Sequence, residues 1–165
     1  MNNKKNVTAS KSIAIVATDN KRTDLIEWSY FNKELLTQHQ LTACGETAVI
    51  VEGTLNTEIN KLFTTDTGGY QQLAKMIENG NIDMLFFFAE PKTSIEKDLD
   101  LKNLLVVAAK HNVVVASNKV TTEMVMASEF SNNGQPMKQR NSTGFLKPLI
   151  SYLSQLFFKP SLTTV

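Results

Sequence analysis

The segment 63–72 carries the residue types of an anion-binding site. It places the hydroxyls of Thr64 and Thr65, and then the paired glycines Gly68 and Gly69, just ahead of an amphipathic helical pattern. Glycines let the backbone come close to a ligand, and the N–H groups of a first helical turn, aided by the helix dipole, point at a negative charge. The pattern is neither a Walker loop nor a dinucleotide fingerprint. Taken alone, it leaves an anion site and an ordinary turn as equal alternatives.

Asp19 and Arg22 follow the first apolar run of the chain, three positions apart. In one interpretation, Asp19 caps the first helix and Arg22 is a solvated side chain of its first turn. In the other, Asp19 orients a polar group of a ligand, and Arg22 pairs with a phosphate or carboxylate through its planar guanidinium. The spacing favours the first interpretation.

Gly45 and Thr47 follow the second apolar run and form a weaker candidate. A glycine in this place commonly just turns the chain, and Glu46 between the two would repel a bound anion. Cys44 has no histidine near it in the sequence. We therefore interpret this cysteine as a buried strand residue rather than as a nucleophile.

Glu90 ends the very apolar run 83–89 and is a candidate general base. A carboxyl group at the end of a buried strand can have a raised pKa, whereas a solvated position would leave the pKa ordinary. Asp98 and Asp100 stand at the start of a helical pattern, where carboxylates commonly complement the helix dipole. Lys97 can either bind an anion or simply be exposed.

The composition indicates one domain with almost no net charge. A chain of 165 residues, 42% of them hydrophobic, is long enough for one sizeable core and too short for two comfortable ones. Seventeen basic and sixteen acidic residues give a net charge of +1, which supplies no general attraction for nucleic acid or for an anionic membrane. A single cysteine and two distant histidines, His39 and His111, exclude an internal disulfide and predict no metal site.

The segments that must position these residues alternate between two patterns. Short apolar runs fit buried parallel strands at 12–17, 41–44, 61–64, 83–89 and 112–117. Helical spacing of apolar residues occupies 22–39, 71–78, 98–111 and 120–128. The alternation predicts an α/β three-layer sandwich around a five-stranded parallel sheet. Ligands of such sheets bind outside the carboxyl ends of the strands, where nearly all the polar candidates fall.

The two ends of the chain are expected to differ from this domain, which spans 12–130. Residues 1–11 have the composition of a solvated arm, and the following apolar run is too short for the core of a signal peptide. No stretch approaches the roughly 18 apolar residues of a membrane span, so we expect a cytoplasmic protein. The composition of segment 131–143 predicts a loop, and the pattern of segment 145–158 predicts an apolar helix. This helix could pack within the protein, dock on another subunit or lie on a membrane surface. Packing is the favoured role.

Several motifs resemble the methylglyoxal synthase family, in order and without large gaps from about residue 12 to residue 128. They are IAIVATD at 13–19, TTDTGGYQQ at 64–72, DMLFFFAEP at 83–91, DLDLK at 98–102 and VASN at 115–118. The resemblance implies a cytosolic α/β subunit, usually assembled as a homohexamer, that binds a small phosphorylated metabolite and needs no cofactor. In the family reaction, a carboxylate removes a proton beside the carbonyl of dihydroxyacetone phosphate. The enediolate then expels inorganic phosphate and yields methylglyoxal.

The resemblance implies that this chain retains part of the family's active site. Asp19 and Asp100 match acidic residues of that site, and Arg22 stands where a phosphate-binding lysine is usual. Gly45 and Thr47 match part of a Thr-Gly-Thr-Thr phosphate loop. Gly68 and Gly69 match the glycine pair that precedes the catalytic base.

Other positions differ from the family, and they include residues that the family uses for acid–base catalysis and phosphate binding. Tyr70 replaces the aspartate that acts as the base, and Thr18 and Lys97 occupy positions where the family has histidines. Cys44 and Glu46 replace phosphate-binding threonines, and the pair at 64–65 replaces Ser-Gly. A phenol with a pKa near 10 is a poor base at neutral pH, and losing a positioned acid–base group typically costs about 10²–10⁴-fold in rate.

Two functions remain open from the sequence. One is an impaired or altered lyase, with Glu90 as base, Asp100 as its acidic partner, Lys97 polarising the carbonyl, and phosphate held by Arg22, Thr47, Thr64 and Thr65. The other is a non-catalytic module on the same fold that senses an anion or regulates a partner.

Overall fold

The computed structural model describes residues 10–89 and 98–131. These residues form one parallel sheet with strand order β3-β2-β1-β4-β5. The strands are β1 (Ser12–Ala17), β2 (Gln40–Cys44), β3 (Asn60–Leu62), β4 (Met84–Phe88) and β5 (Val114–Ala116). The five-stranded parallel sheet predicted from the alternating patterns is confirmed. Because all the strand pairs are parallel, the carboxyl ends of the strands lie at one rim of the sheet, and the connections turn to opposite sides between β1 and β4.

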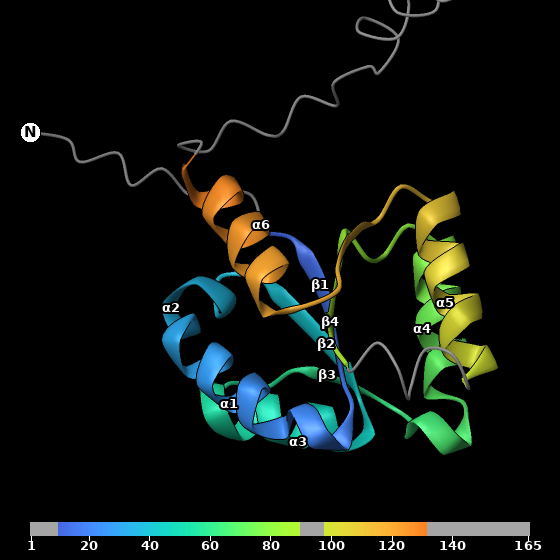
Figure 1. Cartoon of the computed structure of the whole chain (residues 1–165), viewed down its shortest axis with the longest axis horizontal. Coiled ribbons are helices and arrows are strands. Elements are labelled where there is room, and N and C mark those ends of the chain that lie inside the picture. Colours follow the sequence, from blue (N-terminus) through green and yellow to red (C-terminus); the bar gives the residue numbers. More distant parts are fainter. Residues whose placement is uncertain (1–9, 90–97, 132–165) are drawn as a thin grey trace, which may run out of the picture.

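Helices cover both faces of the sheet (Figure 1). On one face lie α1 (Arg22–Phe31), α2 (Lys33–Leu36), α3 (Gly45–Leu55) and α6 (Lys119–Ser131), and on the other lie α4 (Gly69–Glu78) and α5 (Leu99–Lys110). Two short 3₁₀ turns, η1 (Asp19–Lys21) and η2 (Thr65–Thr67), precede α1 and α4. The three-layer arrangement is therefore the one expected from the sequence.

Each strand of the sheet's centre contributes to two cores, because successive side chains point to opposite faces. Ile15 and Phe86 pack toward α1, where the Trp28 ring meets Phe86 edge-on at 5.7 Å between ring centroids. Val16 and Phe87 pack toward α4 and α5 in the second cluster. This alternation explains why β1 and β4 lack the polar positions of a one-sided strand.

The predicted continuous helix over 22–39 was wrong. Helix α1 ends at Phe31, and Asn32 leaves helical geometry at φ −102° and ψ 14°. Both the backbone N–H and the side-chain amide of Asn32 donate to Trp28 O, at 3.0 and 2.9 Å. Local side-chain hydrogen bonds of this kind compete with helix continuation.

Helix α3 was absent from the sequence prediction, which treated Gly45 as a turn. Gly45 does turn the chain, with φ at +47°, but it also begins the helix directly after β2. The buried residues Ala48, Val51 and Leu55 supply helical periodicity, whereas Val49 is 64% exposed. That exposed valine interrupts the polar face and masks the pattern.

The predicted boundaries of β3 and β5 also shift. Strand β3 ends at Leu62 instead of residue 64, and β5 begins at Val114 instead of residue 112. Asn112 adopts a left-handed φ of 55°, which no strand residue does. None of the helices within 10–89 and 98–131 combines the length and apolar composition needed to cross a membrane. The arm at 1–9, the segment 90–97 and the helix predicted at 145–158 lie outside the described residues.

Candidate functional site

A pocket of about 370 Å³ opens at the carboxyl ends of β1 and β2. Among the described residues it is lined by Ala17, Asp19, Arg22, Cys44, Gly45, Glu46, Thr47, Thr64, Thr65 and Asp66. We call it the smaller pocket. The structure thus brings together five of the seven residues that the sequence nominated for phosphate binding, from separate segments of the chain. Gly68 and Gly69 are not among its lining residues.

The glycine pair has a conformational role beside this pocket. Gly68 has φ at +103°, a left-handed conformation that glycine adopts without strain. A Cβ atom on Gly69 would lie 2.3 Å from Phe63 O, so only glycine fits where α4 begins. The Gly69 N–H donates to Thr64 O at 2.9 Å and closes the turn that presents Thr64 and Thr65. Direct contact of the pair with phosphate stays a prediction.

Arg22 is the basic residue of the smaller pocket among the described residues, and it is held by two carboxylates. Its Nη2 atom lies 3.1 Å from Asp19 Oδ1 and also pairs with Glu46 Oε2. Asp19 lies in η1, and α1 has no side-chain cap, so the interpretation of Asp19 as a helix cap was wrong. Both carboxylate side chains are largely exposed, at 93% for Asp19 and 69% for Glu46. An incoming anion would therefore compete with weak, solvent-screened ion pairs.

Two hydroxyls of the smaller pocket, those of Thr47 and Thr64, already have hydrogen-bond partners. Thr47, nearly buried in the first turn of α3, donates to Ala17 O at 3.4 Å. The hydroxyl oxygens of Thr64 and Thr67 lie 2.8 Å apart. Burial raises the pKa of the Cys44 thiol to about 11, which agrees with the predicted buried strand residue and removes it as a nucleophile.

A second pocket of about 880 Å³, the larger pocket, adjoins the first. It is lined, among the described residues, by Ala17, Thr18, Asp19, Asn20, Thr65, Asp66, Tyr70, Asp98, Leu99 and Asp100. Four of these side chains are carboxylic acids and none is basic. Ala17, Asp19, Thr65 and Asp66 line both pockets, so the two pockets lie side by side.

Asp98 and Asp66 are lining residues that the sequence analysis did not nominate. Asp98 caps α5, because its Oδ1 accepts hydrogen bonds from the N–H groups of Asp100 and Leu101 at 3.0 and 3.1 Å. A cap followed by a helical pattern is recognisable in sequence. Asp66 lies within the anion-site segment, and no spacing rule separates it from its neighbours. Within 10–89 and 98–131, no group of His, Cys, Asp and Glu side chains is arranged to hold a metal ion.

Tyr70 stands between the apolar core and the larger pocket. Its side chain is 5% exposed and packs in the cluster that contains Val16, Leu73 and Phe87. Burial raises the pKa of the Tyr70 phenol well above its ordinary value, and the charge of Asp98 raises it further. The hydroxyl is therefore protonated at neutral pH and can donate a hydrogen bond but cannot act as a base.

Of the remaining candidates, Asp100 and Asp19 line the larger pocket as a pair from α5 and η1. Thr18, at a position where the resemblance expects histidine, donates its hydroxyl to Asn20 Oδ1 at 2.7 Å. Glu90 and Lys97 lie outside the described residues. Their places in the site remain predictions.

The fold and the strand-end pockets define a class of protein: a doubly wound α/β domain with a polar site for a small ligand at its sheet rim. A family model described as MGS-like domain matches residues 24–117. The chain belongs to the methylglyoxal synthase family. It is 41% identical to methylglyoxal synthase of Cellvibrio japonicus over 73% of this chain and 78% of that protein. It is 33% identical to methylglyoxal synthase of Proteus mirabilis over 86% and 93%.

Comparison with solved structures agrees with this assignment. The crystal structure of methylglyoxal synthase from Elizabethkingia anophelis matches with a TM-score of 0.70 and 31% sequence identity. The match covers 85% of this chain and 92% of that one. The sequence matches and the structural match each extend over most of the chain, and they agree on the fold and on the family.

Proposed function

We propose that the two adjacent pockets bind a small phosphorylated metabolite, with its phosphate in the smaller pocket. Arg22 supplies a guanidinium suited to phosphate, and the hydroxyls of Thr47, Thr64 and Thr65 line the same space. Gly45 lines the same space, and its lack of a side chain allows the close approach of Thr64. The net charge of +1 supplies no general attraction, so the anion is held by these local contacts.

The family reaction, conversion of dihydroxyacetone phosphate to methylglyoxal and phosphate, is impaired or altered in this protein. The observation that carries this proposal is Tyr70, which occupies the position of the family's catalytic aspartate and has a raised phenol pKa. Lys97 replaces a histidine of the family in the same motif set. Losing a positioned general base typically costs about 10²–10⁴-fold in rate.

Any remaining lyase activity is assigned to other side chains of the site. Glu90 is the proposed base, Asp100 its acidic partner, and Lys97 the group that polarises the carbonyl. Asp19, which also lines the larger pocket, orients a polar group of the substrate. No cofactor takes part in this proposal.

A second candidate function is a non-catalytic, anion-sensing or regulatory module. It is favoured by the pairing of Arg22 with Asp19 and Glu46. A site in which the basic group is already neutralised responds to an anion by exchanging partners, without any need for chemistry. Failure to turn over the family substrate, together with phosphate binding, would support this candidate.

The test is an assay of the purified full chain with dihydroxyacetone phosphate that follows both methylglyoxal and released phosphate. We expect turnover below about 0.1 s⁻¹, a hundredfold under the median enzyme rate of about 10 s⁻¹. Faster turnover would contradict the impaired site. Tyr70→Asp combined with Lys97→His should raise the rate, whereas the same changes at exposed positions, Tyr30→Asp with Lys110→His, should not.

The setting of this function is also proposed. We place the protein in the cytoplasm as a homo-oligomer, a hexamer by resemblance, with residues 12–130 as the methylglyoxal synthase-like domain. An arm at 1–11 and a divergent loop and helix at 131–165 stay predictions, except that Lys11 is hydrogen-bonded to Gln40 and Ser131 belongs to α6. Light scattering of the full chain against a variant truncated after residue 131 would measure the assembly and the contribution of that extension.

A further inference from the structure

We propose that the C-terminal extension of this chain docks on the outer side of α1 and α6, with segment 145–158 lying as a helix against it. The docking surface consists of exposed apolar side chains, which we call the α1–α6 face: Ile26, Tyr30, Phe31, Val120 and Met124. The segment itself lies outside the described residues. The inference goes beyond the proposed function and does not depend on phosphate binding in the pockets.

The first observation is that exposed apolar side chains gather on these two helices. Ten large hydrophobic side chains are exposed among the described residues; five of them form the α1–α6 face, and no other element carries more than two. Phe31 is 80% exposed, and Tyr30 and Met124 are each 67% exposed. Large apolar side chains gathered on one surface of a folded domain indicate contact with another segment or molecule.

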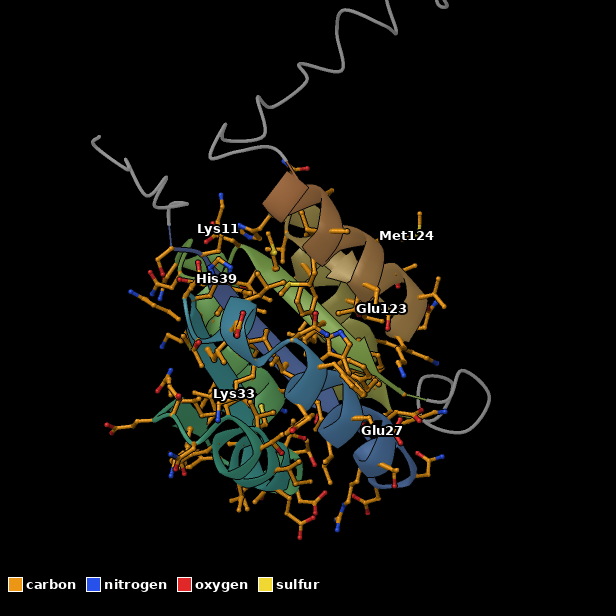
Figure 2. All side chains as sticks on the ribbon, turned by 90° about the vertical axis from the view of Figure 1, so that its left-hand side faces the viewer. Lys11, Glu27, Lys33, His39, Glu123 and Met124 are labelled. Carbon is orange, nitrogen blue, oxygen red and sulfur yellow. The ribbon has the colours of Figure 1, made fainter. Side chains whose placement is uncertain are left out.

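The two helices that carry this face are neighbours. Both cover the same side of the sheet, and Lys119 Nζ of α6 lies 3.9 Å from Glu27 Oε2 of α1. Figure 2 looks onto these helices and shows Glu27 and Met124 on them. Residues four positions apart lie on one side of a helix, and each helix carries such an exposed apolar pair: Ile26 with Tyr30, and Val120 with Met124.

The second observation is the pattern of segment 145–158. Its polar residues recur at helical spacing and so share one side of a helix: Lys147, Ser151, Ser154 and Gln155. Another side of the same helix is apolar, with Leu146, Ile150, Leu153 and Phe157. A helix of this length is marginal alone in water and depends on packing of its apolar side. The segment therefore needs an apolar surface, and the α1–α6 face provides one.

The third observation is the short connection between the two. Helix α6 ends at Ser131, so only residues 132–144 separate it from the segment. A connection of this length reaches up to about 43 Å when extended, whereas α6 is about 20 Å long. The chain can therefore turn back after α6 and lay the segment antiparallel to it. A tether this short gives a local concentration of about a millimolar, which favours this occupant over a second molecule.

The charges of the two parts are complementary. Residues 132–165 contain four basic residues and no acidic one, so residues 1–131 hold thirteen basic and sixteen acidic residues. Glu123, on α6, forms no ion pair within 10–89 and 98–131. In the antiparallel arrangement, Lys159 comes to the start of α6, where Glu123 and Glu27 lie. Opposite charges there favour docking, most strongly at low salt.

The inference is tested by thiol accessibility in the full chain, with iodoacetamide labelling followed by mass spectrometry. Met124→Cys and Tyr30→Cys place thiols on the α1–α6 face, and Val49→Cys on α3 is the matched control, at a residue that is 64% exposed. We expect the first two thiols to react at least about tenfold more slowly than the control, because reaction requires the segment to lift off. Cys44 is buried, and the unsubstituted chain gives its slow background rate.

A second substitution in the segment shows what covers the face. Leu153→Asp puts a charge on the apolar side of the segment and should restore fast labelling at both face positions, without changing Val49→Cys. Ser151→Asp, on the polar side, is the control and should leave the protection in place. Circular dichroism checks that each variant is folded. If Leu153→Asp alters the spectrum of the domain, the milder Leu153→Ser takes its place.

Three outcomes would overturn the inference. One is equal labelling of all three engineered thiols in the full chain. Another is protection that Leu153→Asp does not relieve, because some other part of the molecule would then cover the face. The third is protection that needs a partner: if it grows with protein concentration, a second copy is the occupant, and if it requires added phosphatidylglycerol vesicles, a membrane surface is. Protection by the chain's own segment is independent of both.

Discussion

Among single side chains, Arg22 is the proposed phosphate ligand, but it is already paired with two carboxylates. Its guanidinium pairs with Asp19 from its own segment and with Glu46 from α3. The sequence analysis treated Glu46 only as a group that repels anions. In the structure, Glu46 also forms an ion pair with Arg22, the guanidinium that a bound anion would use. Glu46 therefore opposes anion binding in two ways, by direct repulsion and by competition for Arg22.

Glu46→Gln should therefore strengthen phosphate binding. The change removes a competing carboxylate from the smaller pocket, and we expect about a threefold gain in affinity, since exposed ion pairs are worth about 0.2–1 kcal/mol. Titration of inorganic phosphate at low salt measures the gain, which should shrink at high salt. Glu52→Gln, on the same helix and paired with Lys61 outside the pocket, is the control. Unchanged affinity in Glu46→Gln would show that Glu46 does not limit Arg22.

Two buried hydroxyls of the core offer a second prediction for single residues. Ser29 Oγ has no hydrogen-bond partner in the part of the chain that the structure describes, whereas Thr122 Oγ1 donates to Asn118 O at 2.8 Å, and both residues are 0% exposed. Ser29→Ala should raise the free energy of unfolding by about 1 kcal/mol, because it removes an unsatisfied polar group. Thr122→Val should lower it by a similar amount. Urea denaturation of both variants measures the contrast, and destabilisation by Ser29→Ala would indicate a partner for that hydroxyl.

Among the elements, α3 combines two glycines with opposite requirements. Gly45 begins the helix at a positive φ, and a Cβ there would lie 3.0 Å from Thr64 Cα. Gly53 lies inside the helix, and a Cβ atom there would meet nothing within 4 Å. Gly45 is therefore required for the close packing of α3 against Thr64 beside the smaller pocket. Gly53 has no such role and only lowers the stability of the helix.

Gly45→Ala should destabilise the protein by about 1–3 kcal/mol, since it adds left-handed strain and presses on the Thr64 backbone. Gly53→Ala should stabilise it by about 0.5–1 kcal/mol through helix propensity alone. Thermal unfolding monitored by circular dichroism measures both. If Gly45→Ala were as stable as Gly53→Ala, the close approach of α3 to Thr64 would be wrong.

The elements also show where pattern reading succeeded. Strands β1 and β4 were predicted nearly to the residue, because they are central, buried on both faces and continuously apolar. The shorter outer strands were predicted less well: β3 begins one residue earlier and ends two residues earlier than predicted, and β5 is shorter than predicted at both ends. Helix α3 escaped prediction because Val49 and Val51 give it apolar residues on two sides, of which only Val51 is buried.

Across the whole molecule, the rim opposite the pockets ties three strands together. Lys11, before β1, donates its backbone N–H to His39 Nδ1 at 3.1 Å, and its carbonyl accepts from Gln40 N at 2.8 Å. Ser12 N donates to Asp83 Oδ2 at 2.8 Å, which brings in β4. Figure 2 shows Lys11 and His39 at the same end of the molecule. The bond to His39 requires an unprotonated Nδ1.

The stability of the fold should therefore depend on the charge of His39. Burial lowers the pKa of His39, and the positive charge of Lys11 lowers it further, against an opposing effect of Asp83. The unfolded chain then binds more protons than the native one between the lowered pKa and about 6.5, so stability should fall as pH decreases through this window. Urea denaturation between about pH 5 and pH 7.5 should show the fall. His39→Gln should flatten it, and the exposed His111→Gln should not.

The apolar periodicity of the chain was sufficient to determine the layered architecture, and its ordered motifs were sufficient for the family, because both depend on neighbours in sequence. The partners of the site were not accessible in this way. Arg22 meets Glu46, and Tyr70 lies between the core and four carboxyl groups, only because the order β3-β2-β1-β4-β5 brings the ends of separate strands to one rim. Contacts between distant segments depend on the order of the strands in the sheet. The spacing of residues along the chain does not specify that order.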